Sequence, residues 1–120
     1  MAVFTLAHFE IRPDAGAAAA AEAEMHAFAT YVRAALPAST WTAYRDPRAP
    51  THYIALSRAD DAAADHRQRT APGTEAFTAA LRPLLAGTVE AHTYELVTSS
   101  DLAPRPRSER RAARKRRPQR

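Results

Sequence analysis

One long helical segment without a breaker, placed between β-prone segments, constrains the fold of this chain more than any other feature. Residues 17–36 begin with five alanines and contain no glycine or proline. The apolar side chains that recur there at spacings of three and four are Ala21, Met25, Phe28, Val32 and Leu36. This spacing predicts an amphipathic α-helix that buries one stripe against a partner surface. Glu22 and His26 lie on a different face, which we expect to face solvent.

Four segments rich in β-forming residues surround this helix and predict strands. Residues 3–11 end in a turn cluster, and residues 88–98 form the last β-prone segment. Residues 39–45 and 51–58 flank a segment with two prolines, residues 46–50, which we expect to lie outside any strand. The two flanking runs therefore predict a hairpin with a wide turn.

Two further helices are predicted between the hairpin and the last strand. Ser57 and Asp60 have the spacing of a capping box, with Asp in place of the usual Glu, and predict a short helix over residues 58–67. Another helix is expected over residues 74–86, where Pro83 should kink it or shorten its last turn. The resulting order, β-α-β-β-(α)α-β, is typical of a ferredoxin-like α+β sandwich with all helices on one face.

The hairpin carries large side chains at positions that point to both of its faces. They are Trp41, Tyr44, Tyr53, Ile54 and Leu56. A sheet with helices on one side only leaves its other face uncovered. Apolar residues on both faces therefore predict a homodimer packed sheet to sheet, a dimeric α/β barrel-like assembly.

The charge is divided between a body and a tail. The chain has 120 residues, no cysteine and a net charge of +4. Residues 103–120 carry nine basic side chains and one acidic one, whereas residues 1–102 carry eight arginines and twelve carboxylates. We therefore expect one mildly acidic domain over residues 1–102 and a disordered Arg-rich tail over residues 103–120. This argues against a nucleic-acid-binding fold, although weak nucleic-acid contact by the tail stays an alternative to a solvated extension.

The composition also excludes several kinds of chemistry. Without cysteine the chain cannot form disulfide bonds, thiolate nucleophiles or Cys-ligated metal clusters. No segment approaches the roughly 20 apolar residues of a membrane span, and the first residues lack the pattern of a secretion signal. We therefore expect a cytoplasmic protein without a membrane partner.

Motifs in the middle of the chain resemble a known family. The sequence reads Trp41-Thr-Ala-Tyr44-Arg45-Asp46, then a Pro-containing turn and Tyr53-Ile54-Ala55-Leu56, then Ala62-Ala63-Ala64-Asp65-His66 and Phe77-x-x-x-Leu81-x-Pro83-Leu84-Leu85-x-Gly87. With the opening strand and its Arg-Pro-Asp-Ala-Gly turn, residues 3–100 resemble the antibiotic biosynthesis monooxygenase domain family of small dimeric α+β proteins. The resemblance implies oxygenation of anthrone-like polyketides or quinols without metal or flavin, or, in another branch, haem degradation.

The chain departs from the family pattern in two ways. The haem-degrading branch relies on an Asn, a Trp and a His, and this sequence contains no Asn. Ser57 stands about where many members have an aromatic residue before the short helix. These differences disfavour haem degradation, and the missing Asn also weakens a close match to the anthrone oxygenases.

Oxygenation without a cofactor requires a base, donors for a developing oxyanion and a dry, aromatic-lined cavity. His66 matches the family's histidine position and is the predicted catalytic base. Trp41 is predicted as a wall of the substrate site, and Tyr44 and Tyr53 as donors to the substrate. Each has a structural alternative: His66 could cap its helix, Trp41 could be ordinary packing, and the tyrosines could be strand residues without a role.

Three histidines leave a metal site open as a further alternative. His8, His52 and His92 all lie on predicted strands, and the strands that carry them are neighbours in a ferredoxin-like sheet. Convergence on one face could bind zinc or iron, whereas the resemblance implies no metal and no other cofactor.

The sequence as a whole predicts a homodimeric, cofactor-independent monooxygenase that oxidises an aromatic phenol, quinol or anthrone-like polyketide with O₂. One alternative is a non-catalytic dimeric module that binds a ligand. Another is an isomerase or cyclase on the same scaffold, because a single base in a pocket can move a proton without oxygen. Oxygen consumption separates the oxygenase from both.

Overall fold

The computed structural model describes residues 1–101, and the predictions for the Arg-rich tail lie outside them. The strands are β1 (Val3–Glu10), β2 (Ser39–Asp46), β3 (Ala49–Ala59) and β4 (Glu90–Glu95). The helices are α1 (Ala17–Ala35), α2 (Ala62–Thr70) and α3 (Pro72–Leu81), and a short 3-10 turn, Arg82–Leu84, follows α3. The elements therefore occur in the predicted order.

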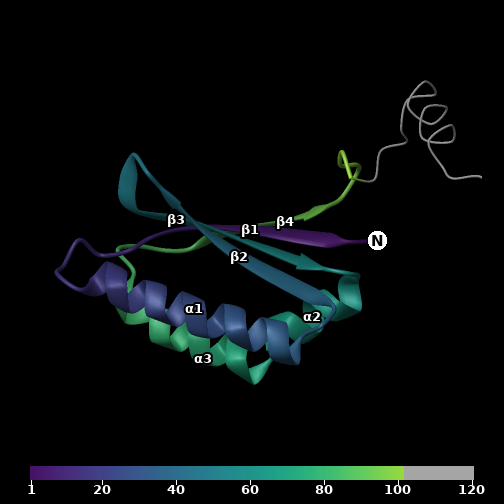
Figure 1. Cartoon of the computed structure of the whole chain (residues 1–120), viewed down its shortest axis with the longest axis horizontal. Coiled ribbons are helices and arrows are strands. Elements are labelled where there is room, and N and C mark those ends of the chain that lie inside the picture. Colours follow the sequence, from purple (N-terminus) through teal and green to yellow (C-terminus); the bar gives the residue numbers. More distant parts are fainter. Residues whose placement is uncertain (102–120) are drawn as a thin grey trace, which may run out of the picture.

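The four strands form one antiparallel sheet in the order β2-β3-β1-β4. All three helices lie on the same side of this sheet, and no element of the described chain covers its other face (Figure 1). Two layers with this strand order form a ferredoxin-like α+β sandwich, which confirms the predicted fold class. The dimer stays a prediction.

Helix α1 buries the apolar stripe that its sequence predicts. Its buried residues are Ala17, Ala21, Met25, Phe28 and Val32. Gly16 precedes the helix with a φ of 82°, a left-handed conformation that suits glycine. Ala21 and Met25 share one core cluster with Phe9 of β1 and Tyr53 of β3, whose rings stack 5.7 Å apart. The main core therefore lies between α1 and the sheet.

The hairpin turn is tighter than the sequence predicts, because only Pro47 and Arg48 separate β2 from β3. The Arg48 backbone N–H donates to Asp46 Oδ1 at 2.9 Å and closes the turn. Pro50 lies inside β3, where the register between β2 and β3 shifts. A proline at such a bulge removes no ladder hydrogen bond. The expectation that residues 46–50 lie outside the strands is therefore confirmed for Pro47 and Arg48 and wrong for Asp46, Ala49 and Pro50.

The predicted capping box at Ser57 is also wrong, because β3 extends past this residue. Ser57 pairs with Thr5 of β1 and with Trp41 of β2, and these two neighbours hold it in an extended conformation. The N-cap of α2 is Asp61 instead, whose Oδ1 accepts a hydrogen bond from the Ala64 backbone N–H at 2.8 Å. Helix α2 consequently begins and ends later than predicted.

Two prolines set the limits of α3. Pro72 lies in its first turn, where the missing N–H costs no helical hydrogen bond. Pro83 lies in the 3-10 turn that replaces the end of the helix, which confirms the predicted interruption and shortens the expected span of residues 74–86. Strand β4 is shorter than predicted, and all of its residues are exposed.

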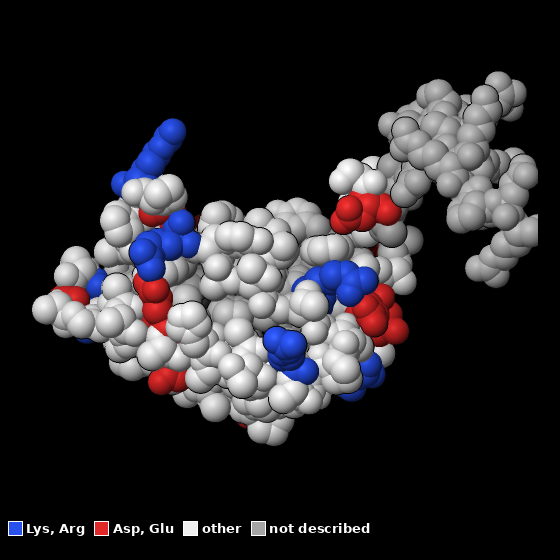
Figure 2. Space-filling view, viewed as in Figure 1, with Lys and Arg blue, Asp and Glu red and all other residues white. Residues whose placement is uncertain are grey.

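The surface of the described residues carries charges of both signs. Figure 2 shows arginines interspersed with Asp and Glu on the face viewed, where they form no extended area of a single sign. None of the described helices is long and apolar enough to cross a membrane.

Candidate functional site

A cavity of about 420 Å³ lies between the sheet and the helices. Residues of all four strands and all three helices line it, together with residues that follow α3. Its volume falls within the range of small-molecule sites, and apolar side chains outnumber polar ones in its lining. A few polar groups in such a setting decide which ligand fits.

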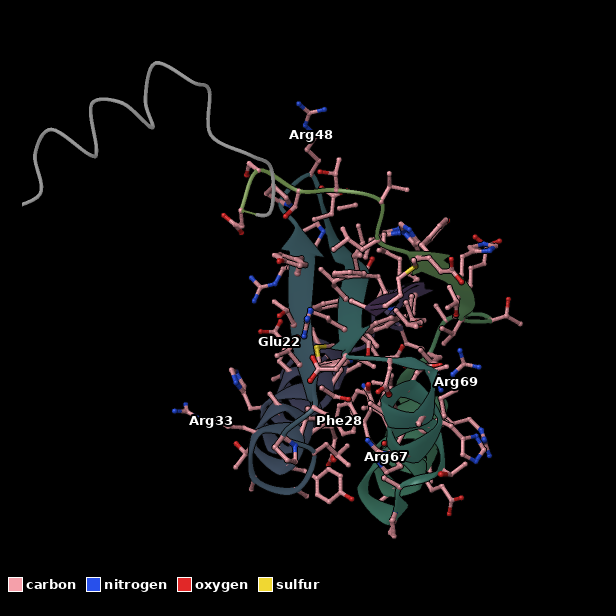
Figure 3. All side chains as sticks on the ribbon, turned by 90° about the vertical axis from the view of Figure 1, so that its right-hand side faces the viewer. Glu22, Phe28, Arg33, Arg48, Arg67 and Arg69 are labelled. Carbon is pink, nitrogen blue, oxygen red and sulfur yellow. The ribbon has the colours of Figure 1, made fainter. Side chains whose placement is uncertain are left out.

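An aromatic wall is formed by Phe28 of α1, Trp41 of β2 and Phe77 of α3. Phe28 and Phe77 stack with centroids 4.5 Å apart, and Trp41 meets both edge-on at 5.0 Å and 5.4 Å. Phe28 points into the space between the helices and the sheet (Figure 3). Flat walls of this kind suit a planar aromatic ligand. The structure places Trp41 in the lining of this cavity, and its role as a wall of the substrate site stays a prediction.

Helix α2 supplies a polar strip, formed by Asp65 and Arg69, that the sequence did not predict as part of the site. Asp65 lines the cavity, its side chain is only 14% exposed, and its Oδ2 pairs with the guanidinium of Arg69 at 2.7 Å. Arg69 also donates to Thr93 Oγ1 of β4 at 3.2 Å, and thus bridges from α2 to the sheet (Figure 3). Thr93 in turn lies 3.2 Å from Thr5 Oγ1. The strip therefore links one helix to two strands beside the cavity.

Gln68, on the same face of α2, carries a buried acceptor without a partner. Its residue exposure is 6%, it lines the cavity, and its Oε1 atom has no hydrogen bond within the described residues. A buried polar group left unsatisfied costs about 1–3 kcal/mol. Proteins keep such a group where a ligand or an ordered water can complete it.

The spacing of these α2 residues offers a signal that sequence reasoning missed. Ala64 and Gln68, four apart, are the buried residues of α2, and Asp65 and Arg69 lie beside them. Residues three and four apart share one helix face, which here is the face toward the cavity. The signal is weak because α2 has few apolar residues from which to read its orientation.

His66, the predicted base, lies on α2 but is exposed and lies outside the cavity lining. The Thr70 hydroxyl donates to its backbone carbonyl oxygen at 2.9 Å. Helix α2 continues for another turn beyond His66, so this residue is not at the helix end as expected. The geometry brings its neighbour Asp65, rather than His66, to the cavity.

Tyr53 is buried, and its hydroxyl donates to Glu22 Oε2 of α1 at 2.7 Å. Arg45 Nη2 of β2 also donates to the two Glu22 carboxylate oxygens, at 2.7 Å and 2.9 Å. Figure 3 shows Glu22 on the side of α1 toward the sheet, with a side chain that is 30% exposed, whereas His26 is exposed as expected. The Tyr53 hydrogen bond, reinforced by Arg45, holds the pKa of Glu22 below its ordinary value. Burial and the Glu22 carboxylate raise the pKa of Tyr53.

The two predicted tyrosine donors lie outside the lining of the main cavity. Tyr53 and Tyr44 instead line a separate hollow of about 320 Å³ beside β2, together with Glu22 and Arg45. Tyr44 is 53% exposed. The structure thus brings Trp41 to the main cavity and leaves the tyrosines with the Glu22 ion pair.

His8, His52 and His92 point away from the helices, because their strand neighbours Phe9, Tyr53 and Ala91 point toward them. His52 Nε2 lies 3.4 Å from a carboxylate oxygen of Glu10. Within residues 1–101, no group of three or more His, Asp or Glu side chains is arranged to hold a metal ion. The three histidines therefore share one face without forming a ligand cluster.

Comparison with known proteins identifies the fold. No protein-family model and no curated protein matches the sequence. The structure of Rv0793 from Mycobacterium tuberculosis shares 22% identity, with a TM-score of 0.74 over 83% of this chain and 99% of that chain. A candidate antibiotic biosynthesis monooxygenase from Caulobacter crescentus shares 20%, with a TM-score of 0.75 over 81% and 91%. SnoaB, a cofactor-independent oxygenase from Streptomyces nogalater, shares 23%, with a TM-score of 0.70 over 82% and 96%. The chain has the fold of these structures, which is the fold that the resemblance implied.

Proposed function

We propose that this chain is a cofactor-independent monooxygenase that oxidises an aromatic phenol, quinol or anthrone-like polyketide with O₂. The observation that supports the proposal most is the cavity, where an aromatic wall of Phe28, Trp41 and Phe77 lies together with the polar strip of α2. The shared fold with a cofactor-independent oxygenase supports the same reaction class.

An anthrone-like substrate needs no cofactor, because its anion can reduce O₂ directly. Loss of a proton gives an electron-rich anion whose methylene carbon bonds to oxygen. The methylene becomes a carbonyl, one oxygen atom stays in the product, and the other leaves as water with the two methylene hydrogens. Four electrons pass from substrate to O₂, so no external reductant is required. The protein has only to accept a proton, stabilise the anion and hold the rings.

Two adjacent residues of α2 compete for the role of proton acceptor. Asp65 lines the cavity and has the better position, whereas His66, which the sequence predicts, is exposed. Arg69 and Arg82 also line the cavity and bring positive charge that stabilises an oxyanion. We assign the base to Asp65 and keep His66 as the alternative that the experiment tests.

The test is oxygen uptake by purified, chelator-treated protein with anthrone and with a dihydroxynaphthalene. Uptake should exceed the spontaneous rate without any added cofactor. Asp65→Asn should lower the enzymatic rate by about 10²-fold or more, as expected on loss of a general base. His66→Ala should retain most of the rate, and His26→Ala, an exposed histidine of α1, is the matched control.

The outcomes separate the competing functions. Loss of uptake in His66→Ala alone would move the base back to His66 and keep the reaction class. Saturable binding of the aromatic compounds without oxygen uptake would replace the oxygenase with a ligand-binding module. Conversion of the substrate to an isomer without oxygen uptake would indicate an isomerase or cyclase.

A further inference from the structure

Gln68 lines the cavity with a buried side-chain oxygen that has no hydrogen-bond partner in the described part of the chain. The residue is only 6% exposed, and its Oε1 atom lacks a hydrogen bond within residues 1–101. Its backbone is fixed, because the Thr74 hydroxyl donates to the Gln68 carbonyl oxygen at the junction of α2 and α3. The side chain therefore projects into the cavity from a defined point rather than from a loose end.

Four other polar side chains of the cavity lining have partners of their own. Asp65 and Arg69 pair with each other. The hydroxyls of Thr74 and Thr78 both donate to backbone carbonyl oxygens, that of Thr74 to Gln68 and that of Thr78 to Thr74. None of these four side chains hydrogen-bonds to Gln68 Oε1 in the structure. The acceptor is thus open to a donor that enters the cavity.

We propose that Gln68 Oε1 accepts a hydrogen bond from an uncharged hydroxyl of the substrate and so selects hydroxylated aromatic rings. This inference rests on the proposed function, since it assigns a specificity residue to the same cavity. A neutral hydroxyl fits better than an ammonium group, because Asp65 is already paired with Arg69 and the charge of Arg82 in the same lining would repel a cation. A site built around a buried acceptor discriminates against ligands that lack the donor.

The test uses binding of two probes of nearly the same shape, 2-naphthol and 2-methoxynaphthalene, measured by calorimetry without turnover. Only 2-naphthol can donate a hydrogen bond. Wild-type protein should bind 2-naphthol about five- to tenfold more tightly, the range expected for one neutral hydrogen bond. Gln68→Met keeps the length of the side chain and removes the acceptor. In this variant the ratio of the two dissociation constants should be close to one. Thr78→Val, which removes another polar group of the cavity lining, should keep the preference.

The preference of the wild-type protein tests the proposal even if Gln68→Met folds poorly. Equal binding of the two probes, binding of neither, or a preference that survives in Gln68→Met would each overturn it. The measurement is independent of oxygen. A Gln68-dependent preference without oxygen uptake would therefore reject the proposed oxygenase and keep the role of Gln68. Oxygen uptake without the preference would reject the role of Gln68 and keep the oxygenase.

Discussion

The carboxylate of Glu22 on α1 is bonded to both strands of the hairpin, to Arg45 of β2 and to Tyr53 of β3. The Tyr53 ring stacks on Phe9, and Phe9 lines the main cavity. A buried phenol that keeps a hydrogen-bond partner is well accommodated in a core. Tyr53 therefore acts as a support behind the cavity rather than as a donor to the substrate.

Tyr53→Phe should lower the free energy of unfolding by about 1 kcal/mol at neutral pH, because it removes a hydrogen bond to a carboxylate and keeps the ring stack. The difference in unfolding free energy between Tyr53→Phe and wild type should become smaller as the pH falls below 4.5, the ordinary pKa of Glu22. A carboxylate whose folded pKa is lowered stabilises the fold above its unfolded pKa and loses this contribution as the pH falls through the folded value. Urea unfolding at a series of pH values measures both effects.

Tyr44→Phe is the matched control for this prediction, because Tyr44 is a neighbouring strand tyrosine that is 53% exposed. It should change the free energy of unfolding by less than about 0.5 kcal/mol at every pH. Equal losses in the two variants, or a Tyr53→Phe difference that grows on acidification, would contradict the role given to Glu22.

At the scale of elements, α2 matters most, because it carries the polar strip of the cavity and is only nine residues long. A helix of that length is not stable alone and depends on its cap and on packing. Asp61 caps its first turn, and Ala64 and Gln68 are its buried contacts. The position of the cavity's polar groups therefore depends on this cap and on the packing of Ala64 and Gln68.

Asp61→Ala should cost about 1 kcal/mol of unfolding free energy, the usual effect of losing an N-cap side chain. Asp60→Ala is the control, because Asp60 is exposed and forms only a surface pair with Arg58, which contributes less than about 1 kcal/mol. Thermal unfolding of both variants and of Ser57→Ala measures the difference. A cost for Ser57→Ala equal to that for Asp61→Ala would restore the capping box that the sequence predicts.

The elements show which features a sequence can predict. The stripe on α1 and the interruption at Pro83 are local patterns, and both predictions are confirmed. The end of β3 is not local, because Ser57 stays extended through pairing with β1 and β2, which lie far from it in the sequence. The site also combines local and non-local features. The sequence predicts Trp41 as a site residue from a local motif, whereas the burial of Gln68 depends on how α2 packs on the sheet.

Gly73→Ala tests the packing of α3 against α1. A methyl group at Gly73 would overlap the ring of Tyr31, so the substitution should cost about 1–3 kcal/mol despite the better helix propensity of alanine. In a Tyr31→Ala background the same substitution should be neutral or stabilising. A double-mutant cycle by chemical denaturation measures this coupling. Stabilisation by Gly73→Ala in the wild-type background would show that the Tyr31 ring moves aside freely.

At the scale of the whole molecule, the uncovered face of the sheet is the surface to explain. Its strand positions include Phe4, Leu6, Ile54, Leu56 and Tyr94. Tyr94 is 54% exposed, and the others are partly exposed. Adjacent apolar residues on an open sheet face are typical of an interface. This arrangement supports the homodimer that the sequence predicts.

Light scattering at micromolar concentration should give twice the chain mass of 13.1 kDa. Leu56→Arg, in the middle of the uncovered face, should give the mass of one chain, because an unpaired charge is costly in an apolar interface. Ala23→Arg, on an exposed position of α1, should leave the dimer intact. A wild-type protein that runs as a monomer would contradict the dimer.

The most direct test of the proposed function follows the oxygen atom itself. Purified protein, free of metal and flavin, is given anthrone under O₂ made of the heavy oxygen isotope, and the product is analysed by mass spectrometry. We expect a quinone that carries one heavy oxygen atom, formed faster than with heat-denatured protein and more slowly with Asp65→Asn. A product without the heavy isotope, or formation no faster than with denatured protein across anthrones and dihydroxynaphthalenes, would contradict it.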